Sequence, residues 1–252
     1  MKLFHMLFFA AVLLVTAGCA SFEEEIFSSD ISIDELEKRM QQAMDPNGRF
    51  VRAKSYIMRQ QISTDRSWME MPEVQMVEVK FRAPDQFKLT TYTDNEPEHA
   101  IIANGSDGWF VDMNRKKVIR LEKKKLEGVM TLARLTNPGT RLKDVFRQVS
   151  IDRSRIGEEV FYRLTCSRGK ASPIYLYISS KDFFSKRLRM STDGSSSRID
   201  YDSQMLNYSM YEGVMIPDES IVYQGNIEQK SKVIYYKLDV ALDDKEFLPP
   251  LF

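Results

Sequence analysis

The sequence predicts an α+β fold: a strongly curved antiparallel sheet of about eleven strands, covered by an N-terminal helix and a central helical lid. Most of the chain alternates apolar and polar residues in short runs that end at tight turn signals, which is typical of an antiparallel meander. Two regions have apolar residues at helical spacing instead. A sheet of that many strands must curl. No boundary rich in Pro, Gly or Ser divides the chain, so we expect one domain.

Residues 1–18 have the layout of a secretory signal peptide. Lys2 supplies a positive charge, residues 7–15 are an unbroken apolar run, and three small residues precede Cys19. The run is too short for a membrane-spanning helix, which needs about 20 apolar residues. Residues 15–19 resemble a bacterial lipobox, which predicts cleavage before Cys19 and lipidation of this residue. The alternative is an ordinary signal peptide with a chance Cys at the cut.

The expected mature chain starts at the lipidated Cys19 and runs to residue 252. Residues 19–32 are short, acidic and polar, so they predict a tether, and residues 33–252 are expected to form the domain. Two or more acyl chains anchor a protein stably, because each buried CH₂ contributes roughly 0.8 kcal/mol. Ala20 follows the Cys. By resemblance to the sorting rule of Gram-negative bacteria, a residue other than Asp there implies the periplasmic face of the outer membrane.

The first folded element is expected to be a helix at residues 33–44. Ser32 stands at its N-cap position with Glu35 three residues on, a capping-box pattern, and an Asp-Pro-Asn-Gly sequence stops it. Strands bounded by Pro, Gly, Asn and Asp turn signals follow. They are expected at residues 50–63, 68–82, 86–93, 98–103, 109–113 and 117–121.

The middle of the chain changes to a helical period. Residues 122–135 place Leu126, Val129 and Met130 on one stripe, which predicts a helix that covers something apolar. A second helix is expected from Asn137, with Pro at its first position. Its stripe is Leu142, Val145, Phe146 and Val149. From Glu158 onward strands return, and the last of them, at residues 228–242, alternates most clearly.

The composition excludes several classes of function. Lys plus Arg (36) equal Asp plus Glu (36), and a balanced charge argues against a nucleic-acid partner, because phosphate binding needs a clustered basic surface. Two Cys cannot form a disulfide framework, and two His leave too few ligands for a metal centre. No motif of a Ser hydrolase, zinc protease, thiol oxidoreductase or P-loop NTPase occurs. We therefore expect no enzyme, no metal and no cofactor.

A few single residues carry further expectations. Cys166 has the parity of the apolar residues in its strand, which predicts a buried structural thiol. His99 has two Glu nearby, but strand neighbours point to opposite faces, so we expect a surface His near a turn. Lys residues at positions 116, 117 and 123–125 form a basic cluster. The cluster is interpreted as a solvated face, with contact to anionic lipid headgroups as the alternative.

Several segments resemble, in order along the chain, the LolA-like proteins, the outer-membrane lipoprotein carrier family. Residues 80–89 (KFRAPDQFKL) are similar to its strand–turn–strand, and residues 104–112 (NGSDGWFVD) to its next hairpin. Residues 211–217 (YEGVMIP) and 236–240 (YKLDV), then Phe247, are similar to its C-terminal strands. The resemblance implies an incomplete β-barrel, closed by a helical lid over an apolar cavity that takes acyl chains. The soluble carrier has no lipid anchor, whereas the receptor of the same fold, LolB, has one, as is expected here.

The predicted function is that of a non-enzymatic, outer-membrane-anchored lipoprotein that binds acyl chains or lipoprotein lipid groups and passes them on. Expected partners are the membrane through the acyl anchor, these lipids, and an envelope transport protein; we expect a monomer. The alternative is a structural or envelope-sensing lipoprotein that uses the curved sheet as a docking surface, and a lipid hydrolase comes third. Parity across the hairpins predicts one concave apolar face beneath the lid. The predicted cavity residues are Phe81, Phe87, Leu89, Trp109, Val111, Leu126, Val129 and Met130.

Overall fold

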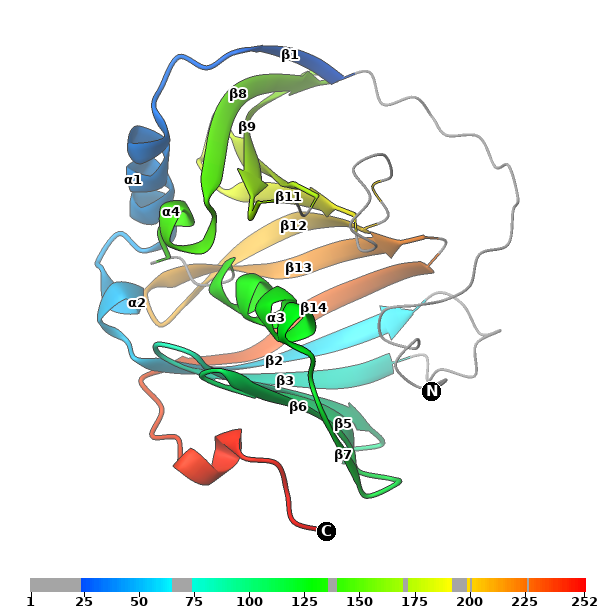
Figure 1. Ribbon diagram of the computed structural model, residues 1–252. Coiled ribbons are helices and arrows are strands. Elements are labelled where there is room, and N and C mark those ends of the chain that lie inside the picture. Colours follow the sequence, from blue (N-terminus) through cyan, green and yellow to red (C-terminus); the bar gives the residue numbers. More distant parts are fainter. Residues whose placement is uncertain are drawn as a thin grey trace.

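The computed structural model describes residues 24–64, 74–135, 140–169, 172–191, 199, 201–225 and 227–252 (Figure 1). The expected signal peptide, the lipidation site at Cys19 and the start of the tether lie outside the described residues.

One antiparallel sheet makes up most of the fold. Its strands are β1 (Glu24–Ser28), β2 (Ser55–Thr64), β3 (Val74–Arg82), β4 (Gln86–Thr93), β5 (Glu96–Asn104), β6 (Asp107–Asp112), β7 (Lys117–Arg120), β8 (Gln148–Ile156), β9 (Glu159–Ser167), β10 (Ile174–Ser179), β11 (Ser185–Met190), β12 (Tyr201–Tyr211), β13 (Val214–Gln224) and β14 (Ile227–Leu238). Their order across the sheet is β1-β8-β9-β10-β11-β12-β13-β14-β2-β3-β4-β5-β6-β7. The sheet curls strongly but stays open, with β1 and β7 as its edges (Figure 1). The antiparallel meander is confirmed, and the described residues hold 14 strands instead of about eleven.

Strand β1 corrects the expectation that residues 19–32 form only a tether. It pairs with β8 along its whole length. The Glu24 carboxylate accepts a hydrogen bond from Ser154 Oγ at 2.7 Å, and two arginine side chains of β8 lie over the Phe27 ring. All of these partners are far away in the sequence, so the local pattern of the segment does not predict a strand. The domain therefore begins before residue 33.

Helix α1 (Ile33–Met44) forms where it was predicted. Ser32 Oγ accepts a hydrogen bond from the backbone N–H three residues on, at 3.2 Å, which satisfies one of the free donors of the first turn. The helix ends at Asp45, which is buried. Its carboxylate accepts from the backbone N–H of Phe50 at 2.9 Å, inside a short helix, α2 (Arg49–Arg52), that the sequence did not predict.

The central helices confirm one expectation and correct another. Helix α3 (Lys123–Leu135) matches the predicted lid. The second helix, α4 (Leu142–Val145), is a single turn, and the expected start at Asn137 lies outside the described residues. Val149, assigned to the helical stripe, belongs to strand β8 opposite Cys166. Pairing with β9 therefore decides the structure of this segment, because the same apolar residues suit either element.

Apolar side chains gather in three clusters. The α3 cluster joins α3 to the concave face of the sheet; its buried members are Phe50, Tyr56, Val77, Val79, Phe81, Phe87, Ala103, Phe110, Leu121, Leu126, Met130, Ala133, Val214, Ile216, Val233, Tyr236 and Leu238. The α1 cluster joins α1 and α4 to β9–β11 and contains Leu36, Leu142, Phe146, Tyr162, Leu164, Cys166, Ile174, Leu176, Ile178 and Leu188. The outer cluster lies on the convex face under the 3-10 helix η2 (Asp244–Phe247) and contains Ala100, Ile102, Val111 and Phe247.

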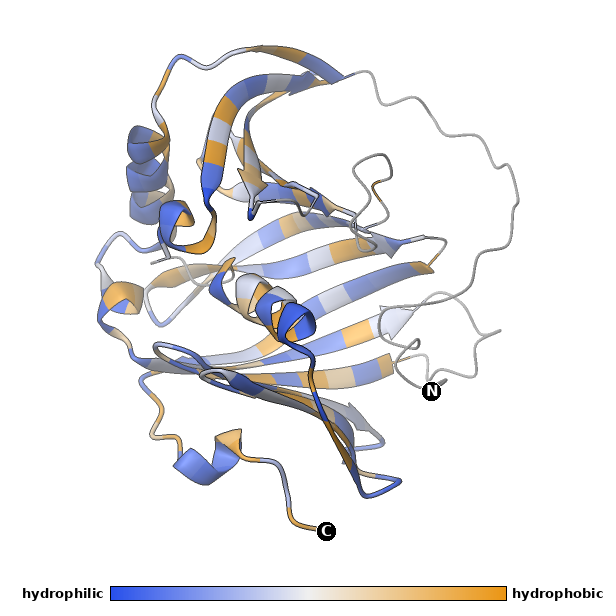
Figure 2. Cartoon of the chain, viewed as in Figure 1, coloured by the Kyte–Doolittle hydropathy of each residue, from blue (hydrophilic) through white to orange (hydrophobic). Residues whose placement is uncertain are grey.

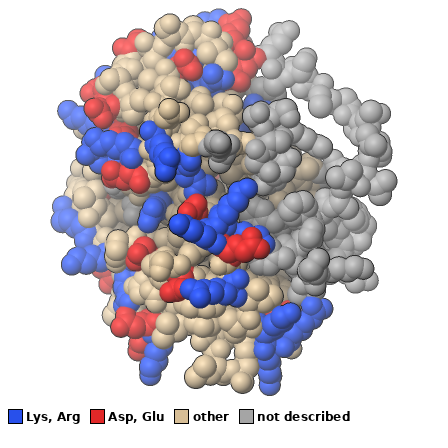
Figure 3. Space-filling view, in the orientation of Figure 1, with Lys and Arg blue, Asp and Glu red and all other residues tan. Residues whose placement is uncertain are grey.

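The positions of the polar residues agree with a core on one face of the sheet. Apolar and polar residues alternate along the strands, as expected for a sheet with one face on a core (Figure 2). On the face seen in Figure 3, cations and anions are interspersed, in keeping with the balanced charge of the sequence. Among the described residues, no helix is long and apolar enough to cross a membrane.

Candidate functional site

The most distinctive feature of the fold is the apolar surface between α3 and the concave face of the sheet. Leu126, Met130 and Ala133 are buried on the sheet-facing side of α3, and Val129 packs half-buried beside them. The lysines at 123–125 are exposed on the first turn. The predicted stripe of the lid is therefore confirmed as the side that meets the sheet.

The floor beneath α3 includes the aromatic and aliphatic residues expected from strands β3 and β4. Phe81 lies directly opposite Phe87, and Val79 lies opposite Leu89, with no shift of register next to Pro84. Phe81 and Phe87 are buried in the α3 cluster, and Leu89 packs against it half-buried. The expectation that these residues share one concave face is correct.

Trp109 and Val111 do not belong to this floor, which corrects the prediction. In the β5–β6 pair, Ile101 lies opposite Phe110, so Phe110 faces α3 and its two neighbours point outward. Val111 is fully buried in the outer cluster with Phe247, and Trp109 packs against that cluster. The prediction assigned the wrong set of alternate residues of β6 to the concave face. A shift of one residue along a strand exchanges its concave and convex faces. Phe110 is the residue of this hairpin that faces α3, and the sequence analysis did not identify it.

Gly108 of β6 lies in close contact with a side chain of α3. A Cβ at this position would lie 2.7 Å from Leu126 Cδ1 and 3.2 Å from Leu121 Cδ1. No real Cβ tolerates the shorter contact. The glycine therefore lets Leu126 pack directly on the backbone of β6, and this position has a steric reason for having no side chain.

An arginine fastens α3 to the opposite half of the sheet. Arg168, just after β9, donates from Nη1 to the backbone carbonyl of Glu127 at 2.8 Å and also to Thr131 Oγ1. Burial lowers the pKa of its guanidinium from the usual value, while the charge of Glu127 opposes the shift. The lid is thus held by apolar packing on one side and by charge-assisted hydrogen bonds on the other.

Polar side chains interrupt the apolar concave face in its centre. Ser209 Oγ donates to Asp218 Oδ2 at 2.6 Å, and the Oγ atoms of Ser220 and Ser231 lie 2.7 Å apart. Ser231 is opposite Ile62, which packs against the α3 cluster, so the serine pair shares the concave face. We call Ser209, Asp218, Ser220 and Ser231 the polar band. Sequence reasoning missed it, although small polar residues at core parity were a usable signal.

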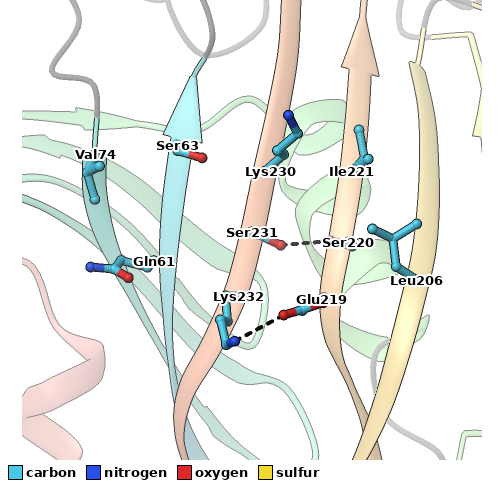
Figure 4. Close-up of a pocket in the computed structure, with 10 residues that line it drawn as sticks. All are labelled: Gln61, Ser63, Val74, Leu206, Glu219, Ser220, Ile221, Lys230, Ser231 and Lys232. Atoms are coloured by element: carbon cyan, nitrogen blue, oxygen red, sulfur yellow. Dashed lines mark hydrogen bonds and ion pairs between the residues drawn. The ribbon is translucent and has the colours of Figure 1, made fainter.

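A shallow depression of about 340 Å³ lies on the other face of the sheet (Figure 4). The side chains of Gln61, Leu206, Glu219 and Lys232 are among those that line it. Lys232 Nζ and Glu219 Oε1 form an ion pair of 3.0 Å across it. The depression is open and mixed in polarity, and α3 lies behind the strands that form it (Figure 4).

The surroundings of His99 and Cys166 show the state of the two titratable side chains that the sequence singled out. Within the described part of the chain, no three His, Cys, Asp or Glu residues could together hold a metal ion. His99 is half-buried, with its ring 5.5 Å from that of Phe110 and its Nε2 3.2 Å from Glu98, which corrects the expectation of a surface His. Cys166 is buried as predicted, and burial raises the pKa of its thiol to about 12. A thiol with such a pKa is a poor nucleophile at neutral pH.

An open, strongly curved antiparallel sheet that packs helices in its concavity defines the half-barrel class of α+β proteins.

No protein-family model matches the sequence, and no curated protein sequence matches it significantly. Solved structures do: a LolA superfamily protein from Nitrosomonas europaea is 16% identical, with a TM-score of 0.61 over 87% of this chain and 98% of its own. A DUF1329 family protein from Desulfovibrio piger is 12% identical, with a TM-score of 0.61 over 86% and 95%.

A third structure, from Vibrio parahaemolyticus, is a domain named for outer membrane lipoprotein sorting. It is 9% identical, with a TM-score of 0.56 over 86% of this chain and 97% of its own. This chain has the LolA-like fold, and the resemblance seen in the sequence is confirmed at that level.

Proposed function

We propose that the protein is a non-enzymatic lipid-binding lipoprotein that holds an acyl chain between α3 and the concave face of the sheet. The observation that carries the proposal is the match of two apolar surfaces, the stripe of α3 and the floor with Phe81 and Phe87, in a LolA-like fold. Half-buried Leu89 and Val129 mark the margin where apolar surface is still within reach of a ligand. The cavity residues of the proposal are Phe81, Phe87, Leu89, Phe110, Leu126, Val129 and Met130.

The same proposal places the protein at the periplasmic face of the outer membrane, anchored through Cys19. The lipobox-like sequence supports the anchor, and Ala20 supports the outer membrane. The name of the Vibrio parahaemolyticus domain supports a role in lipoprotein sorting. In this proposal a monomer receives a lipid or a lipoprotein's acyl group and exchanges it with an envelope transport protein.

Simple energetics show that such binding is feasible. Burying a chain of about sixteen carbons releases roughly 12 kcal/mol gross, at ~0.8 kcal/mol per CH₂. Lost freedom of the ligand and the cost of moving α3 reduce this to a smaller net free energy. We expect a Kd on the order of micromolar, which corresponds to about 8 kcal/mol.

The test uses residues 20–252, which contain every described helix and strand. A fluorescent fatty acid is titrated into this protein and its emission is followed to saturation. Met130→Asp should weaken binding at least about tenfold, because it places a carboxylate beside the acyl chain. Lys124→Ala, on the exposed first turn of the same helix, is the matched control and should change the Kd little.

Absence of saturable binding, together with absence of co-purified lipid by mass spectrometry, would contradict the acyl-carrier proposal. The docking alternative would then take its place. Its surface would be the outer depression of Figure 4, where Val74 and Leu206 are each 50% exposed.

A further inference from the structure

The polar band raises the question of which lipid head group suits the concave face. Its only ionisable member is Asp218, which lies on β13 next to Pro217 at the irregular pairing with β12. Ser209 Oγ satisfies Asp218 Oδ2. Oδ1 is shielded from solvent and has no hydrogen-bond partner among the described residues. Lys232, which forms its ion pair with Glu219, acts on the Asp218 carboxylate through its charge. Oδ1 of the carboxylate can therefore still accept a hydrogen bond.

This oxygen lies beside the proposed acyl site. Tyr211 packs against the α3 cluster and donates its hydroxyl to the backbone carbonyl of Val233 at 3.3 Å. Ser209, whose hydroxyl donates to Asp218, lies directly opposite Ile216, a buried member of the α3 cluster, so the carboxylate lies at the edge of this cluster. An acyl chain beneath α3 would therefore bring its polar end close to the polar band.

We infer that Asp218 is the acceptor for a hydrogen-bond donor on the lipid head group, and that the preferred ligands carry an ammonium with at least one N–H. The inference rests on the proposed acyl-binding function. A shielded carboxylate oxygen without a partner is unfavourable, and an N–H donor with a positive charge compensates both its charge and its lone pairs. A fatty-acid carboxylate or a phosphate monoester has neither an N–H donor nor a positive charge at neutral pH. A quaternary ammonium carries the charge but has no N–H.

The test compares lipids that differ only in how many N–H hydrogens of the ammonium are replaced by methyl groups. Palmitoyl lysophosphatidylethanolamine, its N,N-dimethyl derivative and palmitoyl lysophosphatidylcholine each displace the fluorescent fatty acid from residues 20–252, below their micelle-forming concentrations. The wild-type protein should bind the ethanolamine lipid about tenfold more tightly than the choline lipid, a difference of about 1.4 kcal/mol. The dimethyl lipid keeps one N–H and should stay close to the ethanolamine lipid. This comparison needs no variant, so folding defects cannot affect it.

Two variants test whether the preference for the ethanolamine lipid over the choline lipid depends on the Asp218 side chain. Asp218→Asn removes the charge and should reduce the tenfold preference to about twofold. Glu219→Gln alters the next residue, which faces the outer depression and pairs with Lys232, and should leave the preference unchanged.

Equal affinity of the wild-type protein for the ethanolamine and choline lipids would overturn this inference and leave the acyl site standing. A preference that survives in Asp218→Asn would overturn the role of Asp218. Failure of all three lipids and of the fatty acid to bind would instead count against the proposed function itself.

Discussion

Leu126 of α3 packs on the bare backbone of Gly108 in β6, where a Cβ would lie 2.7 Å from Leu126 Cδ1. We expect this contact to limit how deep the helix lies in the concavity. On the same helix, Gly128 has open space around the position of a Cβ, with no atom within 4 Å. The two glycines therefore form a natural pair for testing how α3 is seated.

Gly108→Ala should destabilise the protein by about 1–3 kcal/mol, because the buried Leu126 must leave its position or α3 must lift. Gly128→Ala should stabilise it by roughly 0.5–1 kcal/mol, since it only removes the conformational freedom of a helical glycine. Urea unfolding followed by circular dichroism measures both. Equal stability of the two variants would show that the close approach at Gly108 does not position α3.

Arg168→Ala should loosen the lid without removing its apolar face. The variant loses the charge-assisted hydrogen bonds to the Glu127 carbonyl and to Thr131. We expect the fluorescent fatty acid to dissociate about tenfold faster. This change corresponds to the lower limit of the roughly 1.5–3 kcal/mol that a hydrogen bond to a charged group contributes. Stopped-flow displacement measures the rate, and Lys124→Ala is the control. An unchanged rate would mean that α3 does not move when the ligand leaves.

The docking of η2 on the convex face should depend on pH through Glu246. Burial raises the pKa of this carboxyl, but the hydrogen bond from Lys80 at 2.9 Å and the charges of Lys80 and Lys88 outweigh it, so the pKa lies below its usual value. A lowered pKa in the folded state adds stability above the unfolded value of about 4.3, and this stability is lost as pH falls through the folded value.

Wild-type protein should therefore be more stable than Glu246→Gln at pH 7, and the difference should shrink as the pH falls below about 4.3. Urea midpoints across this range give the result. Glu122→Gln, with a carboxylate that is 78% exposed, should show no such dependence. A difference that persists at low pH would point to packing and not to charge.

Cys166 should be inert in the folded protein. Its pKa of about 12 leaves almost no thiolate at pH 8, and the side chain is fully buried. Iodoacetamide should leave residues 20–252 unmodified under native conditions and alkylate Cys166 promptly in urea, as read by mass spectrometry. Rapid labelling of the native protein would show that β9 and β10 separate readily.

Cys19 should carry the anchor in the cell. Cys19→Ala should block processing at this site and abolish labelling with palmitate, because the thiol that receives the lipid is gone. Immunoblotting of membrane fractions and metabolic labelling test this. Continued cleavage after Gly18 with continued labelling would leave the lipoprotein assignment without support.

The sequence by itself determined the features that depend on local spacing. The Ser32 cap of α1, the stripe of α3 with Leu126 and Met130, and the buried parity of Cys166 all appear as predicted, because a helix or strand imposes its period on neighbouring residues. The antiparallel meander followed from the tight turns between alternating runs. These features were enough to define an α+β fold with a lid.

Only the tertiary structure decided which residues share a face across different strands. It turned Phe110 inward and Val111 outward, and it recruited Glu24 into an edge strand through partners far along the chain. It also brought Asp218 beside Tyr211 and Arg168 onto α3. The physical reason is that register is set by pairing and packing between distant segments, and a slip of one residue exchanges the two faces of a strand.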